Sequence, residues 1–237
     1  MTLPRCVKPE LLDQLPADDP RAQRSRRDLR RVNLWMRQAG IVAELLLAHG
    51  RDSKPRTLLE LGAGDGTFML RVARKVAHAL PGVKVMLLDR QDLVNRETRE
   101  AFAALSWTVE PVVADVFSFF AGPASRADVV TANLFLHHFE HPGLGQLLGH
   151  VAQAASLFVA CEPRRDRFAL AGSHMLWAIG CNDVSRHDAV VSVHAGFNGR
   201  ELSDAWPEHP AWMLHEQRTG LFTHAFAARR NGAGGAR

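Results

Sequence analysis

The stretch Leu58–Gly66, which reads LLELGAGDG, gives the clearest indication of architecture in this chain of 237 residues. A short apolar run ends in three glycines within five positions, and this pattern predicts a buried strand followed by a tight turn. Glycine suits such a turn because the backbone can bend sharply and approach a ligand without a clashing Cβ. The stretch therefore predicts the first strand of an α/β sheet, with a candidate binding turn at its carboxyl end.

Predicted helices and strands alternate on the C-terminal side of this turn. Strands are expected at 57–61, 83–88, 107–113, 128–134 and 157–161, and helices at 67–80, 93–105 and 142–155. Continuous apolar strands that alternate with helices are typical of a mostly parallel sheet with helices on both faces. Two further apolar runs, 212–218 and 221–229, flank Thr219-Gly220 and predict a C-terminal antiparallel hairpin. Together these elements predict an α/β fold with a seven-stranded sheet.

The chain is expected to form one main domain with an extension at each end. The predicted parts are an N-terminal helical appendage, a main domain and a disordered tail, at residues 1–50, 51–230 and 231–237. The first residues of the appendage are expected to wrap the surface, before helices that run from Pro20 to about Gly40 and then to His49. Residues 163–205 are less regular and are interpreted as an elaboration beside the binding site.

The composition is that of an ordinary globular protein, with 46% hydrophobic and 23% charged residues. No apolar run approaches the roughly 20 residues that a membrane-spanning helix needs, and the N-terminus does not read as a signal peptide. The three cysteines are widely scattered, at Cys6, Cys161 and Cys181, which disfavours disulfides and fits a reducing compartment. A cytoplasmic location without membrane contact is therefore expected.

The net charge of +4 brings a nucleic-acid partner into consideration. Six arginines lie between Arg21 and Arg31, where Leu29, Val32 and Met36 follow one another at helical spacing. A basic helix with an apolar side is more often one solvated face than a docking surface. Nucleic acid is therefore not the expected partner, and an arginine-rich helix that docks RNA or protein is kept as the alternative.

Three acidic residues stand at the ends of three successive predicted strands. Glu60 lies at the end of the first strand, Asp89 closes the second, and Asp115 follows the third. Carboxyl ends of neighbouring parallel strands meet at one edge of a sheet, so these acids are expected beside the glycine turn. A dinucleotide-binding turn would need glycine at Thr67, whereas the third glycine is Gly66, one place earlier. The pattern favours a cationic ligand over a diphosphate, although Asp115 alone also fits a helix cap.

These features resemble the motifs of class I S-adenosylmethionine-dependent methyltransferases. The similarity covers about residues 56–162 and includes the segment 127–139, which reads ADVVTANLFLHHF and spans the fourth predicted strand. The resemblance implies a Rossmann-like fold, methyltransferase activity (EC 2.1.1.-) and S-adenosylmethionine as the cofactor. In that family the glycine turn supports the methionine part of the cofactor. An acid like Asp89 holds the ribose there, and an acid like Asp115 contacts the adenine.

The same resemblance implies a set of cofactor-binding residues around the turn and the strand ends. They are Glu60, Gly62, Ala63, Gly64, Gly66, Asp89, Arg90, Asp115, Val116, Asn133, Leu134 and His138. In addition, Pro16–Arg21 and Ser25–Asn33 resemble small-molecule methyltransferases associated with type III polyketide synthases, which implies a phenolic or polyketide-derived acceptor. The Asn/Asp-Pro-Pro-aromatic motif of amino-group methyltransferases is missing at Asn133–Leu136, and this departure favours an oxygen acceptor.

Histidines are the candidates for taking a proton from a phenolic acceptor, because a hydroxyl with a pKa of about 10 gains from a nearby base. His187 and His194 lie in the segment 163–205, which is expected to form the acceptor side of the site. That segment is also expected to supply apolar walls, from Phe168, Met175, Trp177, Phe197 and Trp206. His137 is the third catalytic candidate, and both it and His138 are interpreted first as lining of the cofactor pocket.

No metal site is expected from the sequence. His137 and His141 are four residues apart, but they fall in a predicted loop and no carboxylate has matching spacing. The predicted function is therefore methyl transfer from S-adenosylmethionine to the oxygen of a small molecule. The alternatives are an RNA or protein methyltransferase that docks through the arginine-rich helix, and a non-catalytic partner subunit with a cofactor-binding fold. The sequence leaves the oligomeric state open.

Overall fold

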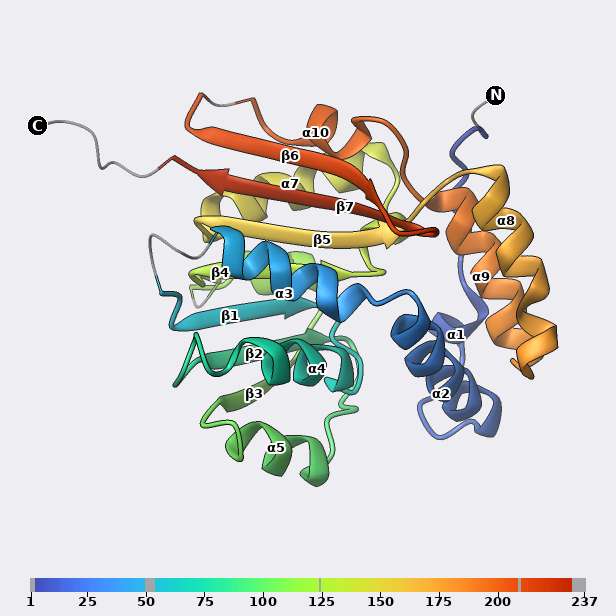
Figure 1. The fold of residues 1–237 in the computed structure, drawn as a ribbon, viewed down its shortest axis with the longest axis horizontal. Helices are drawn as coiled ribbons and strands as arrows, with labels where there is room; N and C mark the ends of the chain where they lie inside the picture. The colour runs from blue at the N-terminus through green and yellow to red at the C-terminus, as the bar shows by residue number, and fades with distance from the viewer. Residues whose placement is uncertain (1–2, 50–53, 124, 209, 232–237) are drawn as a thin grey trace, which may run out of the picture.

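The computed structural model describes residues 3–49, 54–123, 125–208 and 210–231, and its centre is a seven-stranded sheet (Figure 1). The strands are β1 (Thr57–Leu61), β2 (Lys84–Asp89), β3 (Thr108–Val113), β4 (Val129–Asn133), β5 (Leu157–Pro163), β6 (Trp212–Thr219) and β7 (Thr223–Arg230). Their order across the sheet is β3-β2-β1-β4-β5-β7-β6. β1 to β5 are parallel, and β7 is antiparallel to both β5 and β6. The sheet confirms the predicted fold class and its C-terminal hairpin.

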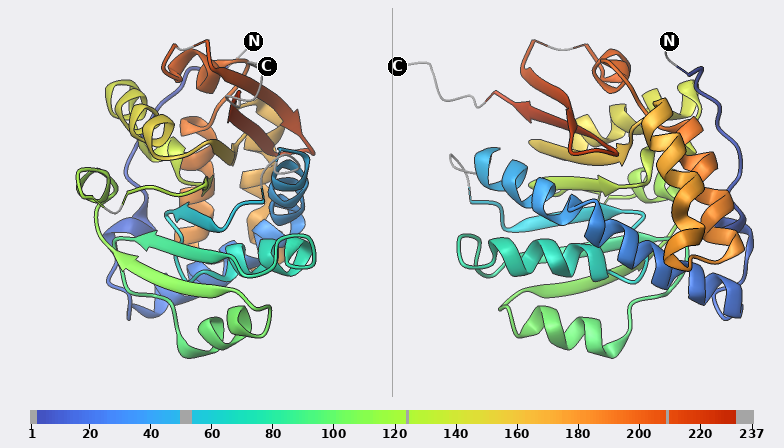
Figure 2. Two further views of the ribbon diagram at one scale, coloured as in Figure 1. Left: turned by 90° about the vertical axis from the view of Figure 1, so that its left-hand side faces the viewer. Right: turned by 45° about the vertical axis from the view of Figure 1, so that its right-hand side comes forward.

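Helices cover both faces of the sheet, as Figure 2 shows. On one face lie α3 (Gln38–His49), α4 (Thr67–Val76) and α5 (Arg96–Ala103). On the other lie α6 (Val116–Phe120), α7 (His141–Ala154) and α10 (Glu201–Ala205). In β1, Leu58 packs into the core on the first face and Leu59 into the core on the second. The central strands are apolar at successive positions because both faces of the sheet are covered.

A group of helices, the cap, lies beyond the carboxyl ends of the parallel strands, at the right of Figure 1. The cap consists of α1 (Leu11–Gln14), α2 (Pro20–Trp35), α8 (Arg167–His174), the 3-10 turn η2 (Met175–Ile179) and α9 (Asp183–Ala195). Residues 163–205 are therefore largely helical, and the prediction of a less regular segment is wrong. Asp166 and Asn182 begin α8 and α9, because their side chains accept the N–H groups of Ala169 and Ser185. Asp and Asn are among the residues favoured at such N-cap positions.

The helix predicted to begin at Pro20 is interrupted before it reaches the sheet. Arg37, between the end of α2 and the start of α3, has a left-handed φ of 55°. This bend allows α2 to lie in the cap while α3 crosses a face of the sheet. Val42 and Leu46 of α3 are buried in the core beside β1. α3 therefore belongs to the core of the main domain, and α1 and α2 are the parts of residues 1–50 that lie in the cap.

Other differences from the prediction concern element ends and two short helices. α5 starts at Arg96 because the side chain of Asn95 accepts the N–H of Thr98 and so begins the helix there. β5 continues to Pro163 because β7 pairs with it as far as that residue. α1 and α6 were not predicted, since helices of four and five residues are too short to show a periodic apolar pattern.

The predicted disordered tail lies outside the described residues beyond Asn231. Among the residues that the structure describes, no helix combines the length and the apolar character that a membrane span requires. The three cysteines are free, and Cys161 and Cys181 are buried.

Candidate active site

A cavity of about 760 Å³ opens at the carboxyl ends of the parallel strands. Its walls come from the glycine turn after β1, the ends of β2 and β4, the start of α6, part of α2 and the segment 7–14. The strand order reverses at β1 and β4, and open α/β sheets bind ligands at such a point. All but one of the predicted cofactor-binding residues line the cavity: Glu60, Gly62, Ala63, Gly64, Asp89, Arg90, Asp115, Val116, Asn133, Leu134 and His138.

Gly66, the exception, lies behind the turn and packs against β2. It precedes α4 with a φ of 74°, and a Cβ there would lie 2.6 Å from a methyl carbon of Leu87. Gly64 differs, because the position of its missing Cβ meets no atom within 4 Å and its φ is 56°. Gly66 is therefore needed for packing inside the protein, while Gly64 leaves open space where a ligand can approach the backbone.

Asp89 and Asp115 line the cavity, and backbone donors fix both carboxylates. Asp89 accepts the N–H of Gly64 at Oδ2 over 2.9 Å and that of Gln91 at Oδ1 over 3.0 Å. Asp115 accepts two N–H groups at the start of α6 through its Oδ1, so it is a helix cap as well as a cavity residue. Each carboxylate retains acceptor capacity for a ligand, since a carboxylate oxygen has two lone pairs.

Three buried acceptor atoms on the cavity wall have no hydrogen-bond partner among the residues that the structure describes. They are Oδ1 of Asn33, Oε2 of Glu60 and Oδ1 of Asn133. Buried polar atoms normally have a partner, so these atoms fit a ligand that brings donors or positive charge. Burial raises the pKa of Glu60 well above its usual value, and the negative charges of Asp65 and Asp89 raise it further. A cationic group beside Glu60 would offset both effects.

Leu134 follows β4 with a φ of 52°, a backbone conformation that residues other than glycine seldom adopt. Its N–H donates to the carbonyl of Cys161 on β5 over 2.9 Å, and the residue lines the cavity. Strained backbone of this kind is concentrated at functional sites, where the surrounding structure holds it in place. The turn after β4 therefore has the features of a binding turn, like the one after β1.

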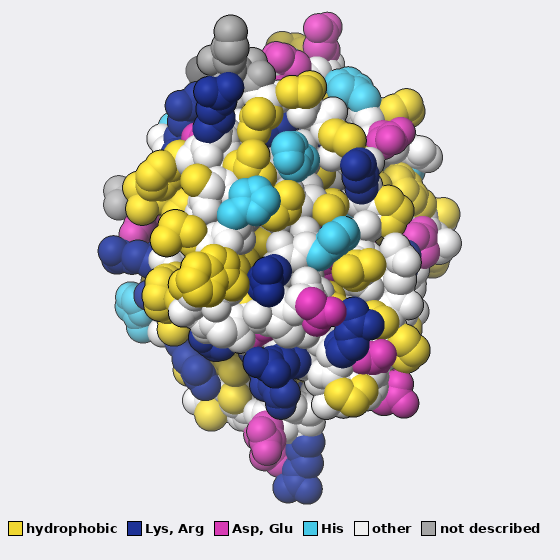
Figure 3. Space-filling model, turned by 90° about the vertical axis from the view of Figure 1, so that its right-hand side faces the viewer, with side chains coloured by type: hydrophobic (Ala, Val, Ile, Leu, Met, Phe, Trp, Pro, Cys, Tyr) yellow, Lys and Arg dark blue, Asp and Glu magenta, His cyan; other side chains and the backbone are white. Residues whose placement is uncertain are grey.

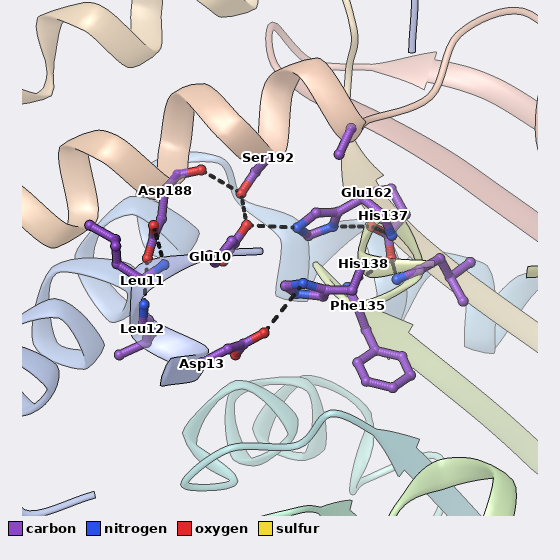
Figure 4. Close-up of polar contacts among 12 residues, drawn as sticks. Glu10, Leu11, Leu12, Asp13, Phe135, His137, His138, Glu162, Asp188 and Ser192 are labelled. Atoms are coloured by element: carbon purple, nitrogen blue, oxygen red, sulfur yellow. Dashed lines mark hydrogen bonds and ion pairs between the residues drawn. The ribbon is translucent and has the colours of Figure 1, made fainter. Parts of the chain in front are cut away.

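A histidine–carboxylate cluster lies at the cap end of the cavity, and Figure 4 shows its members pointing toward one another. It consists of Glu10, Asp13, His137, His138 and Glu162. The two histidines belong to the 3-10 turn η1 (Leu136–His138) after β4, whereas Glu10 and Asp13 come from the N-terminal segment. Glu162 lies at the end of β5 and is fully buried. Residues from opposite parts of the sequence therefore meet at one place.

His137 is buried between two carboxylates. Its Nδ1 lies 2.8 Å from Oε2 of Glu162, and its Nε2 lies 3.2 Å from Oε1 of Glu10. Burial alone would lower the pKa of His137, but hydrogen bonds and charges of the two carboxylates outweigh burial and raise the pKa to about 9. Ser192 of α9 donates a hydrogen bond to Glu10 (Figure 4). The imidazole is therefore held in one orientation.

His138 differs from its neighbour because it faces the cavity and its side chain is 24% exposed. Its Nδ1 lies 3.5 Å from Oδ2 of Asp13. Burial lowers the pKa of His138, and the charge of His137 lowers it further. Burial also raises the pKa of Asp13. His138 therefore offers an accessible ring where a second ligand beside the cofactor would lie.

The three catalytic candidates from the sequence lie in different places. His137 lines the cavity, although both of its ring nitrogens already have partners. His187 is exposed, and its Nδ1 lies 2.9 Å from Asp188. His194 accepts the N–H of Cys6 through its backbone carbonyl, and neither it nor His187 is among the residues that line the cavity. A catalytic role for His187 or His194 stays a prediction.

The apolar walls predicted from residues 163–205 are not at the cavity, and this prediction is wrong. Phe168, Met175 and Trp177 are 55–64% exposed on the cap, while Phe197 and Trp206 are buried in the core beside β5 and α7. The segment instead contributes Ser192 to the cavity. The error arose because apolar side chains were assigned to the site without a helical pattern to say which way they face.

The N-terminal segment supplies the wall that sequence reasoning missed. Residues 7–14, which were expected to wrap the surface, line the cavity on the side of the histidine–carboxylate cluster. Asp188 holds this segment, because its two carboxylate oxygens accept the N–H groups of Leu11 and Leu12 over 2.8 and 2.9 Å. Glu10 and Asp13 are three residues apart, the spacing that places two side chains on one side of a helical turn. That spacing was the available signal.

Five of the six arginines between 21 and 31 have partners within the chain. They are Arg21, Arg24, Arg26, Arg30 and Arg31. Arg21 pairs with Asp183 of α9 over 2.9 Å, and Arg30 pairs with Asp65 of the glycine turn over 3.0 Å. On the cap side of the molecule, Lys and Arg side chains lie among acidic and hydrophobic ones (Figure 3). The arginines of α2 thus attach this helix to its neighbours, and that face is not uniformly basic.

Comparison with known proteins defines the class. Residues 58–156 match the family model described as a methyltransferase domain. The match, the strand order and the glycine turn together indicate a Rossmann-like methyltransferase domain over these residues, as the sequence predicts. No curated protein matches the sequence of the chain.

Solved structures with the same fold include small-molecule methyltransferases. An O-methyltransferase family protein from Burkholderia thailandensis is 21% identical, with a TM-score of 0.62 over 92% of this chain and 62% of that one. The mitomycin 7-O-methyltransferase is 22% identical, with a TM-score of 0.58 over 92% and 60%. This chain thus spans about three fifths of the length of both.

A third structure matches over nearly its whole length. The plantazolicin methyltransferase, solved with a triazolic desmethylPZN analogue and S-adenosylhomocysteine, is 11% identical, with a TM-score of 0.61 over 89% of this chain and 91% of that one. At such identities the likeness concerns the fold. The comparisons give no support for the further resemblance to enzymes associated with type III polyketide synthases.

Proposed function

We propose that the chain transfers a methyl group from S-adenosylmethionine to a hydroxyl oxygen of a small molecule, with a phenolic or polyketide-derived acceptor as the substrate class. One observation carries the proposal. A single cavity joins the glycine turn and its acids to the histidine–carboxylate cluster, so a cofactor and a second ligand can lie side by side. Such contact is what methyl transfer requires, because the reaction depends mainly on alignment and exclusion of water.

The cofactor half of the cavity fits the polar groups of S-adenosylmethionine. Asp89, oriented by two backbone donors, would accept hydrogen bonds from the ribose hydroxyls. Glu60, Asn33 and Asn133 carry the unpartnered acceptors, and they would receive the ammonium group of the methionine part. Asp115 would contact the adenine from the start of α6. When bound, the cofactor supplies an electrophilic methyl group on a positively charged sulfur.

The acceptor half is formed by the segment 7–14 and by η1. Among its polar atoms are the carboxylate oxygens of Glu10 and Asp13 and the ring nitrogens of His138, which can accept the hydrogen of a substrate hydroxyl. In the transfer, a bond forms between the acceptor oxygen and the methyl carbon while the bond from that carbon to sulfur breaks. The hydroxyl proton leaves to solvent or to a basic group of the site, and S-adenosylhomocysteine is the second product. The O-methyltransferases among the structural neighbours support this choice of atom.

The alternatives find less support in the described residues. An RNA or protein substrate docked on α2 would need free arginines, and five of the six already bind groups of this chain. A non-catalytic partner subunit has no need for the unpartnered acceptors that face the cavity. The O-methyltransferase hypothesis therefore accounts for more of the observed geometry.

The proposal is tested by transfer of label from methyl-labelled S-adenosylmethionine into small molecules of a cell extract, followed by mass analysis of the labelled product. A labelled methyl ether supports the proposal. Label in RNA or protein would support the first alternative instead. Calorimetry with S-adenosylhomocysteine runs in parallel, and a chain that binds it but transfers no label to any fraction would support the non-catalytic subunit.

A further inference from the structure

We propose that Glu10, Asp13, His137 and His138 bind one divalent transition-metal ion, and that this ion holds the acceptor hydroxyl. The metal site stands on its own geometry, whereas the role toward the acceptor rests on the proposed methyl transfer. Sequence analysis had predicted no metal site because it considered His137 with His141. The structure instead brings His137 together with acids 127 and 124 residues earlier in the chain.

The distances suit a single ion. Glu10, His137 and His138 each offer one ligand atom, and these three atoms lie within 4.8 Å of one another. Oε1 of Glu10 is 3.2 Å from Nε2 of His137, and Oδ2 of Asp13 is 3.5 Å from Nδ1 of His138. Ligands held at about 2.1 Å around a tetrahedral zinc ion are themselves about 3.4 Å apart. Asp13 lies outside this group of three, and a movement of its side chain would bring in the fourth ligand. Figure 4 shows Asp13 directed at His138 and Glu10 at His137.

The groups behind the ligands have the arrangement of a metal site. Glu162 lies 2.8 Å from Nδ1 of His137, which fixes the proton on that nitrogen and directs the lone pair of Nε2 toward Glu10. Glu162 is itself held, because it accepts the N–H groups of Phe135 and Leu136 over 3.0 and 2.8 Å. A ligating histidine supported by a buried, hydrogen-bonded carboxylate is the usual outer-shell partner of zinc-type ions.

The opposite side of the site is supported equally well. Asp188 of α9 accepts the backbone N–H groups of Leu11 and Leu12. These two residues lie between Glu10 and Asp13 in the chain, so the contact fixes the backbone that carries both acids. Ser192, one turn further along α9, donates to Glu10. The carboxylates of the N-terminal segment are therefore positioned by α9 and not by contacts with solvent.

The donor set points to the kind of ion. Two imidazole nitrogens and two carboxylate oxygens suit Zn²⁺, Co²⁺, Ni²⁺ or Fe²⁺, whereas Mg²⁺ and Ca²⁺ prefer oxygen ligands alone. Three carboxylates, of Glu10, Asp13 and Glu162, surround the two rings, and a divalent cation would offset their charge. Because His138 faces the cavity, expansion to five ligands would give the acceptor a coordination position on that side. A bound hydroxyl loses its proton more readily, which prepares the oxygen for methyl transfer.

The test is calorimetric titration of the metal-stripped full chain with Zn²⁺, with Mg²⁺ as the comparison ion. We expect one zinc ion per chain and at least tenfold weaker binding of Mg²⁺. Asp13→Asn and His138→Gln alter ligands at the cavity surface, and each should weaken zinc binding at least tenfold. Glu162→Gln should weaken zinc binding about 10–100-fold, because His137 would lose the carboxylate that orients it. His174→Ala, at the exposed end of α8, is the matched control and should leave zinc binding unchanged.

Binding of Co²⁺ gives a readout independent of activity, since its visible absorption reports nitrogen and oxygen coordination. The proposal is overturned if neither Zn²⁺ nor Co²⁺ binds. In that case His137 would be a protonated ring held by two carboxylates. It is equally overturned if binding persists in both Asp13→Asn and His138→Gln. S-adenosylhomocysteine is titrated into the same samples. If the chain binds S-adenosylhomocysteine but neither metal ion, the metal site alone is refuted. If the chain binds metal but not S-adenosylhomocysteine, the proposed function alone is refuted.

Discussion

The backbone N–H of Gly64 and the carboxylate of Asp89 are joined by a hydrogen bond of 2.9 Å, which connects the turn after β1 to the end of β2. This bond orients the carboxylate and leaves the space above Gly64 open. Asp89→Ala should therefore weaken the binding of S-adenosylhomocysteine by about 1–3 kcal/mol, because buried ribose hydroxyls would lose their acceptor. Calorimetry measures the change, and Asp92→Ala, on the exposed loop after β2, is the control. Equal affinity for Asp89→Ala and the unaltered chain would remove Asp89 from the cofactor site.

Substitutions at two glycines of the turn should have different effects, one mainly on cofactor binding and the other mainly on the stability of the fold. Gly64→Val places side-chain atoms in the cavity, so cofactor binding should be lost while the free energy of unfolding falls moderately. Gly66→Ala brings a Cβ against Leu87 at a left-handed φ, and should cost about 2 kcal/mol of stability or more. Denaturant unfolding and calorimetry on both variants test the contrast. Normal binding by Gly64→Val would show that the turn does not face the cofactor.

His187 and His194 are candidates that the structure places away from the cavity. Because His187 is exposed beside Asp188 and His194 contacts Cys6 through its backbone, His187→Ala and His194→Ala should each lower the rate less than about tenfold. A general base would instead contribute about 10²–10⁴-fold. Single-turnover transfer to the acceptor, once it is known, measures this. A hundredfold loss in either variant, with cofactor affinity unchanged, would restore that histidine to catalysis.

The arginines of α2 should not make the chain a nucleic-acid-binding protein. Arg21, Arg30 and Arg31 are paired with Asp183, Asp65 and Asp28, so half of the six positive charges are already offset within the chain. Fluorescence anisotropy with labelled RNA should show weak binding that disappears as salt rises to physiological concentration. Tight binding that persists at that salt, and that is lost in Arg27→Ala, would favour the RNA methyltransferase alternative.

A buried pair between β6 and β7 should make stability sensitive to acid. Oε1 of Glu216 lies 2.7 Å from Nε2 of His224, and both side chains are 1% exposed. Burial alone would raise the pKa of Glu216, but hydrogen bonds from His224, Ser203 and the backbone of Leu202 outweigh it and lower the pKa. The stabilisation is therefore full above the unfolded pKa of about 4.3 and is lost as pH falls through the folded value.

Denaturant unfolding at pH 7 and at successively lower pH measures this effect. The free energy of unfolding of the unaltered chain should fall below pH of about 4.3, and that of Glu216→Gln should fall less steeply. Glu97→Gln, on the exposed side of α5, is the control and should keep the slope of the unaltered chain. Identical slopes for all three proteins would show that Glu216 does not contribute.

The parts of the structure that follow from local sequence were predictable, and those that depend on distant contacts were not. β1 and its turn were readable because an apolar run and three glycines lie within Leu58–Gly66. The cofactor-side acids were readable because each follows its own strand. Gly66 shows the limit, since its contact with Leu87 depends on how β2 packs and is absent from the spacing of the glycines.

The acceptor side was harder for the same physical reason. Glu10 meets His137 across 127 residues of sequence, and no periodicity connects them. In α9, Asp188 turns inward to bind the N-terminal segment, so the polar residues of that helix do not simply mark its solvent side. Apolar spacing alone therefore does not show which way the helices of 163–205 face. For this reason Trp177 was predicted to line the cavity, although its side chain is 64% exposed.

Part of the acceptor half of the cavity is encoded apart from the acids of the cofactor half. Glu60, Asp89 and Asp115 all fall within residues 58–156, the part that matches the methyltransferase domain model, whereas Glu10 and Ser192 fall outside it. Mutations in residues 7–14 or in α9 can therefore reshape the acceptor half of the cavity while these three acids stay intact. Exchange of residues 7–14 between relatives would be an economical route to new acceptors.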